Sequence, residues 1–416
     1  MNKRKDTLIK TIGQSNTGGG KIIAFLGSIA KWGGNTMKYA SLAIHGGRHD
    51  NTEIKGVNYP LYLSSTFVQD SIGDYGEFVY SRSNNPTRNN VEQLIAQLEE
   101  AKYSLAMASG MGATALAFSL LKPGDKVLVN SNVYGGTWNY VSRVFEERGI
   151  SYEVVTDFNN YNFDLATDDT RMVFLETPSN PLLYVTDIEA VCKKAHEKGM
   201  LCVVDNTFMT SYLQKPLKLG ADIVVYSATK YYAGHSDIIA GAVVVDDDEL
   251  YTSLKFHQKI LGAILSPFDS FLLARGIKTL PVRMDRSQEN TQKIVEYLEK
   301  HEAVKKVYYP GLESNEGYEL QKRQATGSGA CFSFTMNENY DSVAFCNALE
   351  IFDLAVSLGG VESLVCHPAS MTHESYSKDL QDEIGITDDL LRVAVGIEDV
   401  DDLIEDFERA FKKARK

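Results

Sequence analysis

The strongest constraint on the fold is a series of short, continuously apolar segments that alternate with helical patterns. Strands without an exposed polar face are typical of parallel sheets that are buried on both sides. A helical segment such as 188–198, between two of them, would return the chain to the same end of the sheet. The alternation therefore predicts an α/β fold with a large, mostly parallel sheet. The predicted strands are 126–130, 152–156, 172–176, 201–205 and 222–226.

The pattern changes after about residue 285. Strand-like segments at 330–334 and 391–395 are flanked by helical and loop segments, and the last predicted helix begins near Val400. Its acidic residues come early and its basic residues late, which matches the helix dipole. A chain of 416 residues, 44% of them hydrophobic, is long enough for two cores. We expect a larger domain at 96–285 and a smaller C-terminal α+β domain at 286–416.

Residues 1–36 stand apart from this pattern, with six basic residues and one acid. The apolar stretch at 22–30 is too short to span a bilayer. A signal or transit peptide is one interpretation, but the basic cluster lies far from the apolar stretch and no convincing cleavage site follows. We favour a disordered extension, or a start codon placed too early with Met37 as the natural start.

Charge and cysteine usage restrict the partners. The net charge of −13 disfavours a broad nucleic-acid or anionic-membrane surface. Five cysteines, an odd number without a C-x-x-C pair, argue against a disulfide framework and against a zinc site. We expect a cytoplasmic protein with buried thiols that acts on a small molecule, without a metal, a nucleic acid or a membrane.

Three polar clusters follow predicted strands, namely 176–180, 205–207 and 227–230. Ligands of parallel sheets gather at the carboxyl ends of the strands, so these clusters predict an active site. A lysine after a strand, such as Lys230, is ordinarily just solvated. Here Asp205 ends a neighbouring strand. A Schiff-base lysine and an acid that keeps the ring nitrogen protonated are what pyridoxal phosphate (PLP) requires. We therefore predict that Lys230 carries PLP.

The run that contains Gly110 and Gly112 precedes a predicted helix, where backbone N–H groups can bind a phosphate. With Ala115 it also satisfies G-x-G-x-x-A, so a nicotinamide dehydrogenase is an alternative. That motif needs an acid about 20 residues on, and residues 130–132 contain none. Tyr134, just past a predicted strand, could stack on an aromatic cofactor, although it is one of 22 tyrosines.

The chain resembles the Cys/Met metabolism family of PLP enzymes, which includes cystathionine γ-lyases, cystathionine γ-synthases and methionine γ-lyases. The matching runs keep the family's order from about Met37 to the C-terminus. They are YSRSNNPTR at 80–88, ASGMGA at 108–113, VYGGT at 133–137, ETPSNP at 176–181, VDNTF at 204–208, YSATKY at 226–231, GHSD at 234–237, SLGG at 357–360 and HPASMTH at 367–373. The resemblance implies the type I PLP-dependent transferase fold, similar to aspartate aminotransferase.

The resemblance also implies roles for the cofactor site. Lys230 would form the Schiff base and shuttle the Cα proton, Asp205 would pair with the pyridine nitrogen, and Tyr134 would stack on the ring and act as an acid–base group. The phosphate would be held by residues of two subunits: Gly110, Met111, Ser227 and Thr229 from one, and Tyr80 and Arg82 from its neighbour. An arm at 37–95 would therefore complete the neighbouring site. The implied assembly is a homo-oligomer, a tetramer of two such dimers.

For the substrate, the resemblance implies that Arg392 binds the α-carboxylate, while Asn180 and Ser357 orient the cofactor ring oxygen and the substrate. Cystathionine γ-lyases and γ-synthases carry a glutamate where this chain has Val356 and an arginine where it has Asn139. Both positions are predicted to face the distal part of the substrate, which here meets fewer polar groups.

Three positions favour different members of the family. Val356 is similar to methionine γ-lyases, whereas Gly136 matches cystathionine lyases, and Leu358 speaks against a cystathionine β-lyase. The leading hypothesis is a C–S lyase that eliminates a thiol from methionine, homocysteine, cystathionine or cysteine by α,γ- or α,β-elimination, giving a 2-oxo acid and ammonia. The alternative within the family is γ-replacement on an O-acyl-homoserine, of the cystathionine γ-synthase or O-acetylhomoserine sulfhydrylase type. A non-catalytic homologue is disfavoured, because every matched cofactor position carries a suitable residue.

Overall fold

The larger of two main sheets contains the strands that the sequence predicts. The computed structural model describes residues 31–32, 35–47, 56–374 and 376–416. Seven strands lie in the order β3-β9-β8-β7-β6-β4-β5, and only β9 runs antiparallel to its neighbours. The predicted mostly parallel sheet is therefore confirmed. The strands are β3 (Tyr103–Met107), β4 (Lys126–Asn130), β5 (Ser151–Val155), β6 (Thr170–Glu176), β7 (Leu201–Asp205), β8 (Ile223–Tyr226) and β9 (Gly241–Val245).

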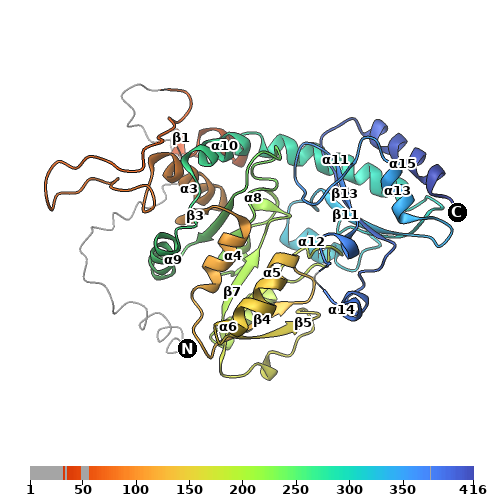
Figure 1. Cartoon of the computed structure of the whole chain (residues 1–416), viewed down its shortest axis with the longest axis horizontal. Helices are drawn as coiled ribbons and strands as arrows, with labels where there is room; N and C mark the ends of the chain where they lie inside the picture. The colour runs from red at the N-terminus through yellow and green to blue at the C-terminus, as the bar shows by residue number, and fades with distance from the viewer. Residues whose placement is uncertain (1–30, 33–34, 48–55, 375) are drawn as a thin grey trace.

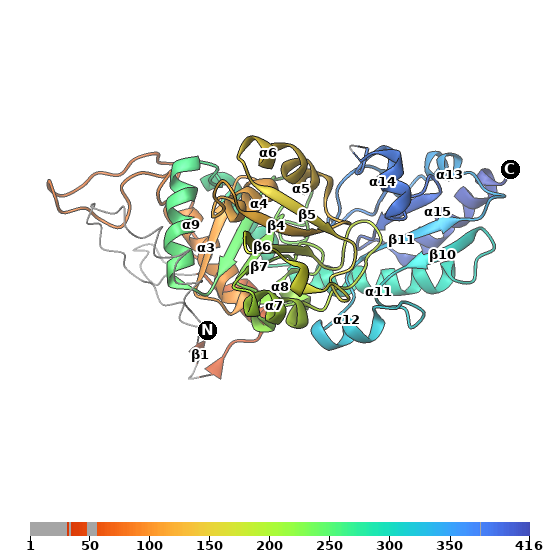
Figure 2. The same cartoon turned by 90° about the horizontal axis from the view of Figure 1, so that it is seen from below.

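Helices cover both faces of this sheet because its strands are apolar on both sides. Along β4, Val127 and Val129 join the core beneath α4, while Leu128 joins the core on the opposite face. Figure 2 shows α5 and α6 on one side of the sheet and α7 and α8 on the other. These helices are α3 (Pro86–Glu99), α4 (Gly110–Phe118), α5 (Gly135–Asn139), α6 (Phe145–Glu147), α7 (Ile188–Glu197), α8 (Thr210–Leu213) and α9 (Asp248–Leu261).

The smaller sheet has the order β10-β11-β14-β13-β12 and is antiparallel except for the pair β12–β13. Its strands are β10 (Val304–Tyr308), β11 (Cys331–Met336), β12 (Asp353–Leu354), β13 (Leu364–Cys366) and β14 (Leu390–Ala394). Phe334, Phe345, Phe407 and Phe411 form its aromatic core with α13 (Ser342–Ala348) and α15 (Val400–Ala414). This is the α+β architecture expected for the C-terminal part of the chain.

Helix α11 (Leu280–Leu298) connects the parts of the chain that contain the two sheets (Figure 1). Its beginning packs in the core of the larger sheet and its end in the core of the smaller one. The predicted domain boundary at 285/286 falls within α11, and the division at 95/96 falls within α3; both boundaries stay predictions. The remaining elements are β1 (Lys31–Trp32), β2 (Asn35–Thr36), α2 (Tyr39–His45), α10 (Pro267–Ile277), α12 (Tyr318–Gln324), α14 (Lys378–Glu383), the π-helix η1 (Tyr140–Val144) and the 3₁₀ turns η2 (Phe163–Leu165), η3 (Pro216–Leu219) and η4 (Pro368–Ser370).

Of the extension predicted at residues 1–36, only the short pair β1 and β2 falls within the described residues. All five cysteines are buried free thiols, as predicted. Among the described residues, no helix combines the length and apolarity that a bilayer crossing needs.

Glu99, at the end of α3, is a wholly buried carboxyl group, and neither of its oxygens has a hydrogen-bond partner among the described residues. Burial raises its pKa to about 8 from an ordinary value of 4.5, although Lys215 and Lys218 act in the opposite direction. The folded chain thus keeps a proton that the unfolded chain releases above pH 4.5. The free energy of unfolding therefore falls as the pH rises from about 4.5 to about 8.

We expect Glu99→Gln to remove this pH dependence, since glutamine is neutral throughout. Its stability advantage over the wild type should grow between pH 5 and pH 9 by on the order of 4 kcal/mol. Urea unfolding at several pH values measures the difference, with Glu197→Gln, an exposed acid on α7, as the control. Parallel pH profiles for the wild type and Glu99→Gln would contradict a buried, protonated Glu99.

Candidate active site

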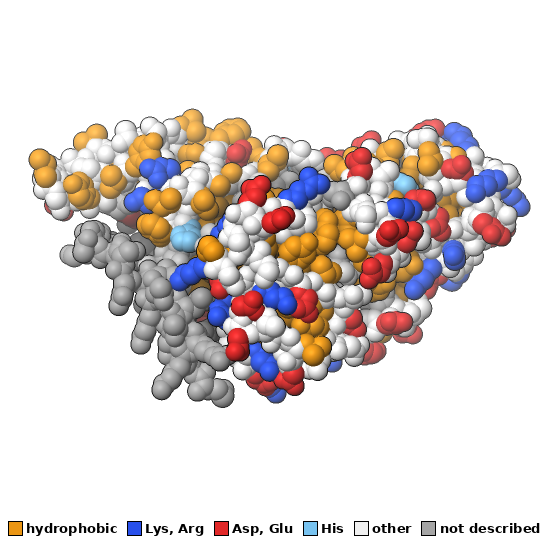
Figure 3. All heavy atoms as spheres, turned by 60° about the horizontal axis from the view of Figure 1, so that its bottom comes forward, with side chains coloured by type: hydrophobic (Ala, Val, Ile, Leu, Met, Phe, Trp, Pro, Cys, Tyr) orange, Lys and Arg blue, Asp and Glu red, His pale blue; other side chains and the backbone are white. Residues whose placement is uncertain are grey.

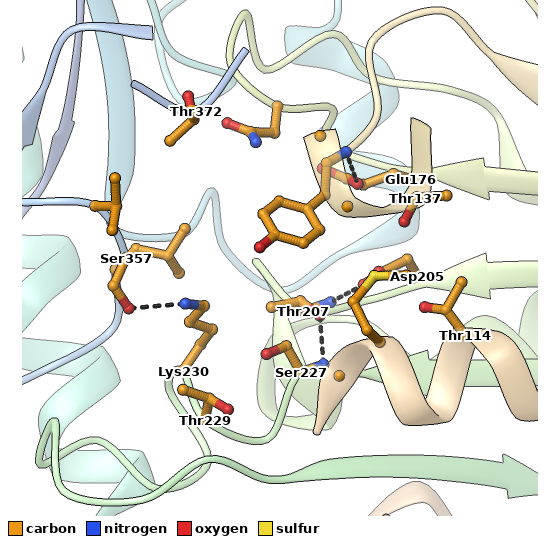
Figure 4. Close-up of a pocket in the computed structure, with 18 of the residues that line it drawn as sticks. Thr114, Thr137, Glu176, Asp205, Thr207, Ser227, Thr229, Lys230, Ser357 and Thr372 are labelled. Carbon is orange, nitrogen blue, oxygen red and sulfur yellow. Dashed lines mark hydrogen bonds between the residues drawn. The ribbon is translucent and has the colours of Figure 1, made fainter. Parts of the chain in front are cut away.

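A cavity of about 550 Å³ lies at the carboxyl ends of β6, β7 and β8, beside the first turn of α4. The three polar clusters predicted from the sequence meet in it (Figure 4). Strand register brings them together, because Glu176 pairs with Asp205 across β6 and β7, and Asp205 pairs with Val225 across β7 and β8. The predicted clustering at one edge of the sheet is therefore correct.

Lys230 lies in the turn that follows β8, with its amine directed toward the smaller sheet. Its Nζ donates a hydrogen bond of 2.7 Å to the Ser357 hydroxyl (Figure 4). Burial, assisted by the charge of Arg392, lowers the Lys230 pKa to about 8. A neutral amine is both a nucleophile and a base, so this lowered pKa suits either role near neutral pH.

Two acidic side chains share the floor of the cavity. Asp205 ends β7 and accepts a hydrogen bond of 3.0 Å from the Thr207 backbone N–H. Burial raises the Asp205 pKa to about 6. Burial and the neighbouring Asp205 carboxyl raise the pKa of Glu176 well above its ordinary range. Burial thus favours the neutral form of Glu176, and Asp205 is the group of the pair suited to carry the negative charge and to face a cation within the cavity.

Glu176 has a structural task as well. It accepts a hydrogen bond of 2.9 Å from the backbone N–H of Tyr134 and so fixes the start of α5 beside the cavity. Tyr134 itself is 48% exposed and lines the cavity. Its ring lies so close to Gly136 that a Cβ added there would come within 2.5 Å of a ring carbon. A glycine at 136 thus allows the tyrosine ring to lie this close to the backbone.

The first turn of α4 and the turn after β8 form an anion cradle. The Ser109 hydroxyl caps α4 by accepting a hydrogen bond of 3.0 Å from the Gly112 N–H. A Cβ on Gly110 would lie 2.6 Å from the Ser227 side chain, so only glycine permits this approach. Backbone N–H groups at a helix start and the Ser227 hydroxyl are suitable donors for a phosphate. Thr229 lines the cavity too, but its hydroxyl already bonds both backbone groups of Ala240.

Arg392, on β14, reaches the cavity from the smaller sheet and is 3% exposed. Its Nη1 donates to Asn180 Oδ1 at 2.9 Å, and its Nη2 donates to the Ser357 carbonyl at 2.8 Å. The Nε–H has no partner among the described residues. A guanidinium has five N–H donors, so this fixed side chain keeps donors for a carboxylate. Ser357 holds a φ of +101°, a strained conformation of the kind found at functional sites.

Val356 and Asn139, the two positions predicted to face the distal part of a substrate, both line the cavity. Tyr80 and Arg82 are not among its lining residues. Arg82 instead donates 2.7 Å to the carbonyl of Lys259, and its guanidinium carbon lies 5.6 Å from the centre of the Tyr80 ring. Their assignment to the site of a neighbouring subunit stays a prediction.

Several lining residues were not predicted from the sequence. Glu176 belongs to one of the predicted polar clusters, but no role was predicted for it. The available signal was that its strand lies next to the strand that ends at Asp205. The roof comes from a distant segment that follows η4, where the run at 367–373 indicated the family but no role at the site was predicted. Its lining residues are Met371, Thr372 and Glu374.

Residues 40–412 match the model of a protein family described as Cys/Met metabolism PLP-dependent enzyme. The chain belongs to this family. The predicted membership is confirmed, and the nicotinamide alternative is set aside. For this family member, the cavity also fits the cofactor: a lysine, a negatively charged acid, a phosphate cradle that a Cβ would fill, and a ring-sized space beside Tyr134.

Two relatives and one solved structure match nearly the whole chain. A cystathionine β-lyase from Lactococcus lactis subsp. cremoris is 46% identical, over 89% of this chain and 98% of the relative. A cystathionine γ-lyase from Dictyostelium discoideum is 46% identical, over 91% and 99%. The crystal structure of a cystathionine γ-lyase from Lactobacillus plantarum, complexed with L-serine, superposes with a TM-score of 0.89 at 41% identity, covering 91% of this chain and 99% of the other. The type I PLP fold is thus confirmed. The β-lyase and the γ-lyase match equally well, so identity does not distinguish β- from γ-cleavage, and the interpretation of Leu358 stays a prediction.

Proposed function

We propose that this enzyme is a PLP-dependent carbon–sulfur lyase of sulfur amino acid metabolism. Elimination would release a thiol from methionine, homocysteine, cystathionine or cysteine, and hydrolysis would then yield a 2-oxo acid and ammonia. The observation that carries the proposal is the placement of a fixed arginine, Arg392, beside the Lys230 amine in one cavity, where both side chains bond Ser357. The identity of 46% to named cystathionine lyases supports the same class of substrate.

The cofactor supplies an electron sink for the substrate Cα. The side chains of this chain hold the reacting groups around it. Arg392, supported by Asn180, binds the α-carboxylate and orients the Cα–H bond. The Lys230 amine, neutral in part because its pKa lies near 8, takes the Cα proton. Asp205 would keep the pyridine nitrogen protonated through its negative charge, and the Tyr134 phenol would pass a proton to the departing sulfur.

A panel of methionine, homocysteine, cystathionine and cysteine tests the proposal, with 2-oxo acid, ammonia and thiol all measured. A C–S lyase releases the three products in equal amounts from at least one substrate. Whether cystathionine gives pyruvate and homocysteine or 2-oxobutyrate and cysteine distinguishes β- from γ-cleavage. Turnover of none of these compounds by cofactor-loaded enzyme would refute the lyase.

The second candidate is γ-replacement on an O-acyl-homoserine. A cystathionine γ-synthase from Xanthomonas oryzae pv. oryzae, in complex with cystathionine, superposes with a TM-score of 0.88 at 40% identity. The same lysine, aspartate and arginine would serve both reactions. Incubation with O-acetylhomoserine and cysteine separates them, because replacement gives cystathionine whereas elimination gives ammonia.

We also propose a homo-oligomer, a tetramer of two dimers that share their active sites. The projecting arm, residues 56–85, carries many exposed hydrophobic side chains, which Figure 3 shows gathered on one extension of the molecule. Exposed apolar surface of this extent marks an interface. The side chains are Val57, Leu61, Tyr62, Leu63, Val68, Ile72, Tyr75, Val79 and Tyr80. A second copy that covered the arm would receive Tyr80 and Arg82. The five buried free thiols support a cytoplasmic location.

Arg392→Lys should raise KM for amino acid substrates by about 10- to 100-fold, with a smaller change in kcat. Lysine cannot bond Asn180 and the Ser357 carbonyl and still present a planar pair of donors. Steady-state kinetics on the best substrate measure the change, and an unchanged cofactor absorption spectrum controls for misfolding. An unchanged KM would remove Arg392 from substrate binding.

A further inference from the structure

The mouth of the cavity carries an acidic side chain that the proposed reaction does not use. Glu374 lies in the segment between η4 and α14 and lines the cavity together with Met371 and Thr372. The side chain is exposed. Its carboxylate forms no hydrogen bond or ion pair with any residue that the structure describes. A cavity-lining charge without a protein partner is available to a ligand.

Charges are distributed unevenly along this cavity. The inner end holds the cation Arg392 beside Lys230, whereas Asp205 and the buried Glu176 form the floor. Among the lining residues, Glu374 alone is an exposed acid. A substrate whose α-carboxylate binds Arg392 therefore extends its far end toward a negative charge.

The space beyond Val356 is also lined by acidic rather than basic side chains. A second cavity, of about 630 Å³, continues from the first and shares Val356, Ser357 and three other lining residues with it. Its lining contains neither lysine nor arginine, while three of its other lining residues are acids. These are Asp237, Asp353 and Glu362. The acidic side chains of both cavities would therefore favour a positive charge at the far end of a substrate, near Glu374 as well as beyond Val356.

We propose that Glu374 binds the distal ammonium group of a diamino sulfur substrate, that is, a thioether in which both halves are amino acids. The proposal rests on the proposed lyase function and names its substrate class. Val356 leaves one wall of the mouth apolar, and Glu374 supplies a carboxylate from the roof instead. Glu374 is thus a specificity residue, which distinguishes diamino thioethers from substrates with a single amino group.

Two analogues of L-cystathionine test this role, each lacking only the distal ammonium. S-(3-carboxypropyl)-L-cysteine serves for β-cleavage, and S-(2-carboxyethyl)-L-homocysteine serves for γ-cleavage. We expect the wild-type holoenzyme to prefer cystathionine over the matching analogue by about 10-fold in kcat/KM, mainly through KM. Glu374→Gln should lose most of this preference. Glu383→Gln, which changes an exposed acid on α14 outside the cavity, should retain it.

An equal preference in the wild type and Glu374→Gln, with equal cofactor content, would overturn the assignment. If the wild type cleaves none of the three compounds, cystathionine is not its lyase substrate, and the panel with methionine, homocysteine and cysteine still decides the lyase function. The role of Glu374 is then read from binding, through the change in cofactor absorption when cystathionine or its analogues are titrated. A Kd ratio of about 10 in the wild type that falls toward 1 in Glu374→Gln supports the role, and equal ratios overturn it.

Discussion

Lys230→Ala is expected to lower kcat/KM by at least about 10⁴-fold, because in the proposed function one side chain would provide both the covalent attachment of the cofactor and the base for the Cα proton. The Lys230 amine faces the cavity, bonds Ser357 and has a pKa of about 8. For the wild type, the neutral fraction of a free Lys230 amine increases as the pH rises through 8. The rate of proton transfer should rise with it.

Borohydride reduction followed by peptide mass analysis measures the attachment directly. The wild type should carry a cofactor-modified peptide that contains Lys230, and Lys230→Ala should carry none. Lys322→Ala, a change on the surface helix α12, should behave as the wild type. A trapped adduct on another lysine in the wild type, or near-normal turnover by Lys230→Ala, would reject the assignment.

Asp205→Asn should lower kcat by about 10²- to 10³-fold while the protein still binds the cofactor. The neutral amide removes the charge that would keep the pyridine nitrogen protonated. The phosphate cradle at Gly110 and Ser227 lies on other elements and stays intact. The loss should therefore appear in kcat rather than in cofactor content.

Absorption spectroscopy and steady-state kinetics together check this separation. Asp205→Glu retains the charge and should recover part of the lost rate, since Thr207 can still donate to a carboxylate at this position. A rate for Asp205→Asn within threefold of the wild type, at full cofactor content, would show that this carboxylate does not control the ring nitrogen.

The larger sheet could be predicted where strands are continuously apolar. β4, β6, β7 and β8 are such strands, and their burial on both faces is what their composition requires. β3 and β9 were not predicted. β3 includes Ser104, whose hydroxyl is satisfied by the carbonyl of Glu92 in α3, and β9 begins at Gly241, against which the Ser109 carbonyl packs. β3 depends on this distant partner in α3, which local patterns do not reveal, whereas β9 is as continuously apolar as the predicted strands and the prediction omitted it.

The residues of the site also include some that could be predicted from the sequence and others that could not. Asp205 and Lys230 were predictable because parallel strands bring their carboxyl ends to one edge. The bond from Lys230 to Ser357 joins residues 127 positions apart, and no spacing indicates it. Arg392 by itself is one arginine in a strand, and its function was predicted only through resemblance. The commitment of the Thr229 hydroxyl to Ala240 likewise required the three-dimensional structure.

The two sheets contribute different parts of the cavity. The lysine, the aspartate and the phosphate cradle belong to the seven-stranded sheet, whereas Arg392, Ser357, Val356 and Glu374 belong to the C-terminal part of the chain. Mutations at Val356 and Glu374, which do not bond Lys230, can therefore alter which molecules are accepted without disturbing the groups proposed to carry out bond breaking. Such a modular layout makes new specificities accessible in few evolutionary steps. It offers a physical reason why a β-lyase, a γ-lyase and a γ-synthase, which catalyse different reactions, are 46%, 46% and 40% identical to this one chain.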